Sequence, residues 1–325
     1  MLKRSAAVCS NLIFTVLFAC SFTGGTSTAA QTLSGTLVVA VPVNEGLVAC
    51  SDKRAFNDRT GTFDDNFVKI RKVNKNTLFV VTNTIGFLNR SNGKLEFDVF
   101  RITENYLAQN AFAAEPRFWD GLKREFRKHL LDYLAKQKFA DWPETDRENN
   151  KLLTNLVFFS ATEKGRVSYT LRVFYEKAPT PVIYIPDVVS ELVRTPKLSG
   201  KGKSVIDYLA RNPSLTQDPA ILQFDQTRFD IKKTTIKDAV AFAGKLFHLT
   251  NAGIPQARVS STYDCALLGY QNGFEWIGNS LGTQAPPLAR TRPRSQPMAN
   301  TQRRAQRDFF AFHAYAGEGA CIPGE

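Results

Sequence analysis

The sequence has few of the residues that hold metal ions or bind nucleotide phosphates. Its 325 residues include five cysteines and three histidines, and no C-x-x-C pair occurs among them. The histidines (His129, His248 and His313) are not spaced as metal ligands usually are. The segment from Gly200 to Gly202 is a lone G-x-G, without the other residues of a phosphate-binding loop. We therefore expect neither a metal site nor a cofactor.

The sequence also lacks an N-terminal hydrophobic run long enough to cross a membrane comfortably, because the first one extends only from Ala6 to Ala19. Lys3 and Arg4 precede this run, and the small residues 27–30 follow it. A basic start, a short apolar centre and a small-residue end are typical of a secretory signal peptide. We expect residues 1–30 to be removed during export to the periplasm or the extracellular space.

Cysteine is too scarce for a disulfide framework. A lipoprotein anchored at Cys20 is an alternative to simple export, although the bulky Phe18 disfavours it. Removal of the signal peptide leaves Cys50, Cys265 and Cys321, which allow at most one intramolecular disulfide. Because Cys50 lies in an apolar run, we interpret it as a small buried residue rather than a nucleophile.

Basic residues outnumber acidic ones, and the formal net charge is +12. No nucleic-acid-binding module accompanies this charge, so we expect a solvated basic surface and no nucleic-acid partner. Residues 279–325 are rich in Pro and Arg, and their low apolar content predicts a disordered tail. Weak binding of this tail to an anionic envelope surface is one expectation, and docking of its Phe309–Phe312 cluster on the domain is another.

Hydrophobic periodicity predicts the elements in chain order. Strands are expected first, then a helix pair, then more strands, a helix, a polar loop, a helix and a closing hairpin. The expected strands are 37–43, 47–50, 77–84, 153–161, 166–175, 181–185, 263–270 and 274–277. The expected helices are 104–114 with Thr103 as its cap, 118–138, 204–210, and 237–249 with Thr235 as its cap, and residues 211–234 are expected to be a loop.

Three groups with complementary chemistry lie near the first hairpin. They are a hydroxyl on Thr36, a carboxylate on Asp52 and an ammonium on Lys69. The three are spread over two strands and the approach to a third, so we expect them to converge at one end of a sheet.

The same stretch resembles the start of a proteasome β-type subunit, a family of N-terminal nucleophile (Ntn) hydrolases. The resemblance extends over residues 36–278 and is strongest at its beginning. Asp52 follows Thr36 at the distance that the family pattern requires, whereas Lys69 implies one inserted residue between Arg59 and Asp65. The matching motifs are Gly35-Thr36, then G-x-V-x-x-x-D-x-R-A at Gly46, Val48, Asp52, Arg54 and Ala55, then V-K-I-x-K-V from Val68 to Val73.

The resemblance implies an α+β fold, a four-layer αββα sandwich of two antiparallel sheets covered by helices. It implies a short propeptide, residues 31–35, which is removed by cleavage between Gly35 and Thr36. Thr36 would then be the nucleophile and its free α-amine the proton acceptor, in an autoprocessed threonine protease or amidase. Lys69 would favour deprotonation of the hydroxyl, and Asp52 would keep Lys69 charged and oriented. Family members assemble into rings, so the resemblance also implies a homo-oligomer.

Three positions depart from the family pattern. The glycine-containing segment that stabilises the oxyanion is replaced by a stretch in which the backbone N–H of Asn83 is the expected donor. Lys201 stands in place of the serine of a Gly-Ser-Gly turn. The family's bracing Asp and Ser have no clear counterparts, and Asn251, the nearest polar residue, is assigned no role.

Two other functions therefore stay open. The chain could be a non-catalytic binding or assembly protein of the envelope, in which Asp52 and Lys69 form only a stabilising ion pair. It could also be a basic envelope-binding protein that acts through its tail. The first residue of the mature chain discriminates between these readings, because only the hydrolase needs Thr36 exposed.

Overall fold

The computed structural model describes residues 31–34, 36–57, 61–88, 94–144, 151–225 and 227–277. The expected signal peptide, Cys20, Gly35 and the expected tail from residue 279 onward lie outside these ranges.

The larger of two sheets has ten strands, and all its pairings are antiparallel. Its main path runs through β11 (Val182–Tyr184), β10 (Gly165–Glu176), β9 (Leu152–Thr162), β7 (Thr77–Leu88), β1 (Gln31–Ser34), β4 (Ala55–Asn57) and β5 (Thr62–Asp64). Beside this path, β12 (Val189–Leu192) pairs with β10, while β6 (Ile70–Asn74) and β8 (Leu95–Asp98) pair with β7.

The smaller sheet has five strands and contains the first hairpin. Its order is β13 (Lys197–Gly200), β2 (Leu37–Val43), β3 (Gly46–Asp52), β14 (Tyr263–Gly269) and β15 (Gly273–Trp276). Strands β2 and β3 are entirely buried, as expected for strands covered on both faces.

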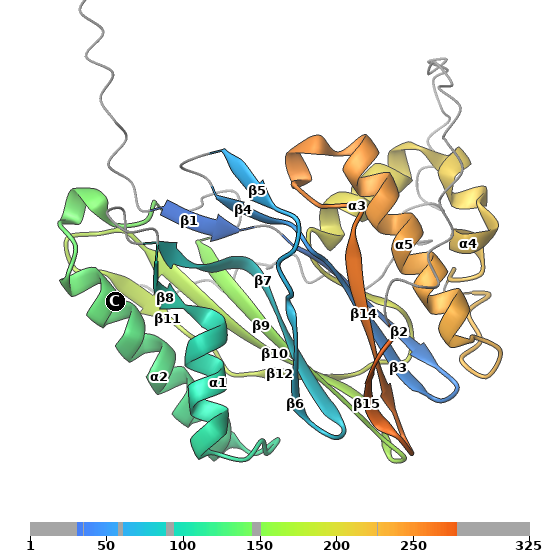
Figure 1. Ribbon diagram of the computed structural model, residues 1–325, viewed down its shortest axis with the longest axis horizontal. Coiled ribbons are helices and arrows are strands. Elements are labelled where there is room, and N and C mark those ends of the chain that lie inside the picture. Colours follow the sequence, from blue (N-terminus) through green and yellow to red (C-terminus); the bar gives the residue numbers. More distant parts are fainter. Residues whose placement is uncertain are drawn as a thin grey trace, which may run out of the picture.

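Helices cover the outer face of each sheet (Figure 1). The larger sheet carries α1 (Val99–Gln109) and α2 (Pro116–Ala135), followed by the 3₁₀ turn Phe139–Asp141. The smaller sheet carries α3 (Gly202–Arg211), α4 (Pro219–Leu222) and α5 (Ile236–Gly253), with 3₁₀ turns at Pro213–Gln217 and Pro255–Ala257.

Three apolar clusters separate these layers. One lies between α1, α2 and the larger sheet, and a second lies between the smaller sheet and the helices that follow it. The third lies between the sheets, where Ala49 and Leu268 of the smaller sheet meet Val80 and Phe159 of the larger one. This order of layers is the expected four-layer αββα sandwich, so the predicted fold class is confirmed.

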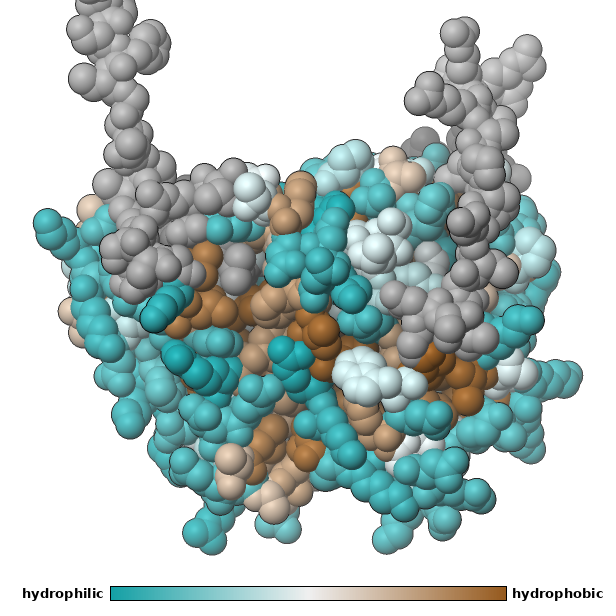
Figure 2. All heavy atoms as spheres, viewed as in Figure 1, coloured by the Kyte–Doolittle hydropathy of each residue, from teal (hydrophilic) through white to brown (hydrophobic). Residues whose placement is uncertain are grey.

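Hydrophilic side chains cover most of the rim of the face shown in Figure 2, and hydrophobic ones gather along its middle. Among the described large hydrophobic side chains, Leu192 on β12 and Tyr184 on β11 are the most exposed, and Phe63 on β5 and Trp276 on β15 are nearly as exposed.

Helix starts test the capping predictions. Thr235 caps α5 as expected, through a reciprocal capping box with Asp238. The prediction that Thr103 caps a helix from Glu104 was wrong, because α1 begins five residues earlier. Asp98 is the cap and accepts the backbone N–H of Arg101, whereas Thr103 is buried inside the helix and donates its hydroxyl to the carbonyl of Val99.

Other boundaries also differ. The expected loop 211–234 contains α4 and a 3₁₀ turn, and β7 continues four residues past Thr84. Seven short strands were not predicted, whereas β11 and β15, which are equally short, were predicted from the turn residues that precede them. The strands that were not predicted are β1, β4, β5, β6, β8, β12 and β13.

A disulfide joins Cys50 on β3 to Cys265 on β14. The two residues face each other directly across the paired strands and are separated by 215 positions in sequence. Cys50 is buried, as expected, and the bond is one of the three pairings that Cys50, Cys265 and Cys321 allow.

Candidate active site

Asp52 and Lys69 form a fully buried ion pair at the end of the smaller sheet. The Nζ atom of Lys69 lies 3.0 Å from Oδ2 of Asp52, and neither side chain is exposed to solvent. Lys69 also donates to the backbone carbonyl of Arg54. The expected convergence of a carboxylate and an ammonium from two separate segments is therefore present in the structure.

Asp52 also fixes the backbone on the carboxyl side of Thr36. Its Oδ1 atom accepts the N–H of Leu37 at 2.7 Å, and its Oδ2 atom accepts the N–H of Arg54 at 3.1 Å. Because Leu37 directly follows Thr36, the ion pair is attached to the chain one residue from the expected nucleophile. Thr36 itself is buried, with 1% of its surface exposed.

Burial favours the neutral form of each partner and shifts its pKa accordingly. It lowers the pKa of Lys69, and the charge and hydrogen bond of Asp52 oppose this shift. It raises the pKa of Asp52, which Lys69 and the N–H groups of Leu37 and Arg54 oppose. Lys69 is consequently an ammonium that loses its proton more readily than a lysine in water.

A second ion pair, between Arg54 and Asp65, is connected to the first through the backbone of Arg54. Arg54 makes a bidentate contact with Asp65, at 2.6 Å from Nε and 2.9 Å from Nη2. This contact raises the pKa of the arginine and lowers that of the carboxylate. The guanidinium also reaches the side chain of Asn251 at 3.4 Å and the carbonyl of Val259 at 3.5 Å. Arg54 thus connects the start of β4 to the end of α5. Asn251, which had no assigned role, accepts a hydrogen bond from the Arg54 guanidinium.

The turn before α3 lies against Thr36. Gly200 has a φ of +72°, and a Cβ atom there would lie 2.1 Å from the carbonyl oxygen of Thr36. The next residue, Lys201, donates its backbone N–H to that same oxygen at 3.0 Å. The G-x-G segment is therefore a close-approach turn, and its first glycine is required by both φ and space.

Asn83 lies where β7 changes partners. Residues from Thr77 to Asn83 pair with β9, and the pairing with β1 begins at Thr84. Asn83 has a φ of +67°, a region that asparagine tolerates better than most residues. Asn83 therefore holds a left-handed position that most other residues would take only with strain.

Strand β1, the segment just before Gly35, lies between two strands of the larger sheet. Ser34 pairs with Phe56 on β4 and with Thr84 on β7, both in antiparallel register. An extended segment that ends beside Thr36 is thus held by backbone pairing on both of its edges.

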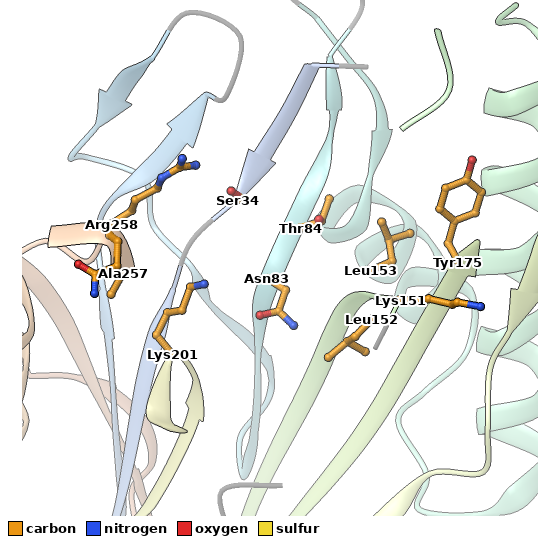
Figure 3. Close-up of a pocket in the computed structure, with 11 residues that line it drawn as sticks. Ser34, Asn83, Thr84, Lys151, Leu152, Leu153, Tyr175, Lys201, Ala257 and Arg258 are labelled. Carbon is orange, nitrogen blue, oxygen red and sulfur yellow. The ribbon is translucent and has the colours of Figure 1, made fainter. Parts of the chain in front are cut away.

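A pocket of about 280 Å³ opens beside this strand (Figure 3). Its described lining residues are Ser34, Asn83, Thr84, Lys151, Leu152, Leu153, Tyr175, Lys201, Gln256, Ala257 and Arg258. Ser34, two residues before Thr36, and Lys201, whose backbone N–H binds the Thr36 carbonyl, both line the pocket, so it lies beside Thr36.

Sequence reasoning missed Asp65, Gln256 and Arg258. Each lies in a loop or a short element and reaches the site only through the fold. Within the described ranges, no group of three or more His, Cys, Asp or Glu side chains could hold a metal ion. No described helix is both long enough and apolar enough to span a membrane.

Comparison with protein families and with curated proteins found no match to this sequence. Among solved structures, the chain is similar to the Anbu (Gly-1) mutant from Hyphomicrobium sp. strain MC1. The two are 15% identical with a TM-score of 0.40, over 75% of this chain and 86% of that one. A likeness at this level does not assign a family, so the fold class rests on the layers described above.

Proposed function

We propose that this chain is an exported, proteasome-like hydrolase of peptide or amide bonds, activated by cleavage between Gly35 and Thr36. One observation carries the proposal. A buried ammonium–carboxylate pair, Lys69 and Asp52, binds the backbone next to Thr36, and an extended leader strand ends just before it. A purely structural ion pair does not need to lie at the junction of a leader segment and a strand.

Cleavage would give Thr36 a free α-amine, whose ordinary pKa of about 8 suits a general base near neutral pH. The Thr36 hydroxyl attacks the substrate carbonyl while the amine accepts its proton, and the amine then returns a proton to the leaving nitrogen. Water hydrolyses the resulting ester and regenerates the hydroxyl. The positive charge of Lys69 favours the alkoxide character of the attacking oxygen, and Asp52 orients that charge.

The backbone around Asn83 would stabilise the oxyanion. Its left-handed conformation turns the peptide plane at the point where β7 passes from β9 to β1. A preorganised N–H donor beside the developing negative charge is worth about 3–4 kcal/mol in comparable sites.

The leader strand indicates how a substrate would bind. Once β1 is released, its place between β4 and β7 would accept another extended segment through the same backbone pairing. This mode favours peptides over compact amides.

The disulfide supports export. Structural disulfides form and persist mainly in oxidising compartments such as the periplasm and the extracellular space. The Cys50–Cys265 bond therefore agrees with a chain that leaves the cytosol, as the proposed signal peptide of residues 1–30 requires. Ring assembly is part of the same proposal.

One observation favours the alternative, a non-catalytic binding or assembly protein. Strand β1 is the link between β7 and the β4–β5 hairpin in the path of the larger sheet. Cleavage and release of β1 would remove that link, whereas a scaffold protein would keep it permanently.

Turnover by threonine variants tests the proposal. The exported protein should cleave peptide amides, Thr36→Ser should keep part of that activity, and Thr36→Ala should lose it by at least about a hundredfold. Peptide cleavage that is equal in the wild type and Thr36→Ala would come from another source and would sink the hydrolase.

A further inference from the structure

The pocket beside Thr36 has basic residues and no acidic ones among its described lining residues. Lys151, Lys201 and Arg258 contribute to its wall. Lys151 is neutralised by Glu176, whose carboxylate lies 2.5 Å from its Nζ atom. Lys201 and Arg258 form no ion pair with any carboxylate in the described part of the chain. Two positive charges are therefore left for a ligand.

These two cations are held in place by the elements around them. Lys201 is the N-cap residue of α3, and its backbone N–H is bound to the Thr36 carbonyl. Arg258 ends the 3₁₀ turn after α5 in a left-handed conformation, and its guanidinium lies 3.5 Å from the centroid of the Phe56 ring. Stacking on an aromatic ring leaves the edge of a guanidinium available for a planar acceptor.

The start of α3 adds to the positive field. The helix has ten residues, its first turn contains no acidic residue, and no side chain caps its first amides. The N-terminal end of a helix attracts anions through these free N–H groups and its dipole. Lys201, which stands at this helix end, and Arg258 make this wall of the pocket a site for negative charge.

Ser34 shows where on a substrate that charge would be. It is on β1, and it lines the same pocket as the two cations. In Figure 3 the charged ends of Lys201 and Arg258 extend toward the side on which Ser34 lies. A longer side chain at this place in a bound strand would enter the pocket and approach both of them.

We infer that this site selects an extended peptide with a carboxylate two residues before the Thr36 position, held by Lys201 and Arg258. The inference rests on the proposed function for the identity of the ligand as a peptide strand. The carboxylate comes from a Glu or Asp side chain in the place of Ser34, because a chain that ended there would have no peptide bond for Thr36 to cleave. The pocket volume of about 280 Å³ accommodates either side chain.

Thermal unfolding tests the pocket without any need for catalysis. The full chain with Thr36→Ala should keep residues 31–35. Two variants of it are compared, one that also carries Ser34→Glu (the Glu chain) and one that also carries Ser34→Gln (the Gln chain). We expect the Glu chain to melt about 1–3 °C higher than the Gln chain, since a half-exposed ion pair contributes up to about 1 kcal/mol. Lys201→Gln together with Arg258→Gln should remove this difference.

Lys203→Gln provides the matched control for charge. Lys203 is in the same helix and pairs with Asp207 at the surface, at 2.9 Å. Lys203→Gln removes one charge outside the pocket, as Lys201→Gln alone removes one inside it, and it should leave the Glu–Gln difference intact. Equal melting of the Glu and Gln chains, or an effect of Lys203→Gln as large as that of Lys201→Gln alone, would overturn the inference.

Peptide turnover by the mature protein tests the place of the carboxylate on the substrate. Amidated peptides with Glu at the position of Ser34 should be cleaved about three- to tenfold faster, in kcat/KM, than those with Gln. Equal rates for the two peptides, or a gain only from a free C-terminal carboxylate beyond the cleaved bond, would overturn the inference. Absence of any turnover combined with the melting difference would contradict the hydrolase and support the pocket, so the two failures are distinguishable.

Discussion

Asp52 and Lys69 are more than a surface ion pair, because neither side chain touches solvent. Two charges in such a position cost several kcal/mol of desolvation each, and their mutual attraction roughly offsets that cost. The backbone groups around them, on Leu37 and Arg54, complete the hydrogen bonding of the carboxylate. Each charge therefore depends on the other for its stability in the fold.

Single and double replacements of this pair should differ in unfolding free energy. Lys69→Met leaves an uncompensated buried carboxylate and should cost about 3–5 kcal/mol. Adding Asp52→Asn removes that charge, so the double variant should lose less stability than Lys69→Met alone. Urea unfolding of the wild type, Lys69→Met, Asp52→Asn and the double variant measures the coupling energy between the two side chains. Additive losses would show that the two side chains do not interact.

Lys69 should also set the alkaline limit of processing and turnover. Its pKa is lowered from the ordinary value of 10.5, so it is deprotonated at a lower pH than a lysine in water. Activity should fall as pH rises through that lowered pKa. In the window between it and 10.5, the unfolded chain binds the proton that the folded chain has lost. The contribution of Lys69 to stability therefore rises with pH there.

These opposite trends separate titration from unfolding. Rate profiles and melting temperatures should be recorded upward from neutral pH. The stability trend is taken as the difference from the Asp52→Asn/Lys69→Met variant, which cancels the titration of tyrosines. The profiles extend to pH 10.5, the ordinary pKa of lysine, and constant activity up to that pH would contradict a role for the Lys69 charge.

Sequence motifs identified those site residues that lie close together along the chain. Asp52 and Lys69 belong to motifs of recognisable spacing after Thr36, so the approach of these two side chains to each other could be anticipated. Arg258 and Lys201 reach the pocket from segments far apart in the sequence, and no local pattern connects them to Thr36. Asn83 was identified by its position, but its left-handed backbone depends on the change of partner strand at β7.

At the level of elements, long strands and helices were predictable and most short ones were not. Strands β2, β7, β9, β10 and β14 have clear apolar runs, and α5 has a capping box. Strands β1, β4 and β5 form by pairing with their neighbours, which no local pattern of three or four residues encodes. The place of β1 between β4 and β7 was therefore visible only in the fold.

The turn between β13 and α3 should be sensitive to a single methyl group. Gly200→Ala adds left-handed strain and places its Cβ against the backbone carbonyl of Thr36, which no side-chain movement relieves. We expect it to slow processing at least tenfold, because the scissile bond is displaced.

Gly61→Ala is the matched control for this turn. Gly61 has a similar φ of +66°, but nothing lies within 4 Å of its Cβ position. It should cost about 1 kcal/mol of stability and leave processing unchanged. Intact-mass analysis and melting of both variants measure these effects, and equal behaviour of the two would show that contact with Thr36 is unimportant.

At the scale of the whole molecule, the disulfide joins strands at opposite ends of the described chain. Cross-linking β3 to β14 restricts the unfolded chain, and disulfides that close long loops typically contribute about 2–4 kcal/mol. Cys50→Ala with Cys265→Ala should lower the unfolding free energy by that amount. A reducing agent should destabilise the wild type and leave the double variant unaffected. An equal effect of the reducing agent on both proteins would mean that the bond does not form.

The layers agree with the expected sandwich because each sheet has a buried inner face and a helix-covered outer one. Hydrophobic patterning determines this arrangement over most of the chain. Whether the molecule is a hydrolase or a scaffold depends instead on one covalent event at Gly35-Thr36, and patterning carries no information about that event. The fold is compatible with both functions, and they differ in whether β1 is cleaved off or retained.

The first residue of the exported protein tests the central claim most directly. Intact-mass analysis of the wild type and of Thr36→Ala, each purified after export, reads it in one measurement. The account predicts a wild-type species that starts at Thr36 and a variant that retains residues 31–35. A wild-type protein that always keeps residues 31–35 would contradict it and would identify the chain as a binding or assembly protein.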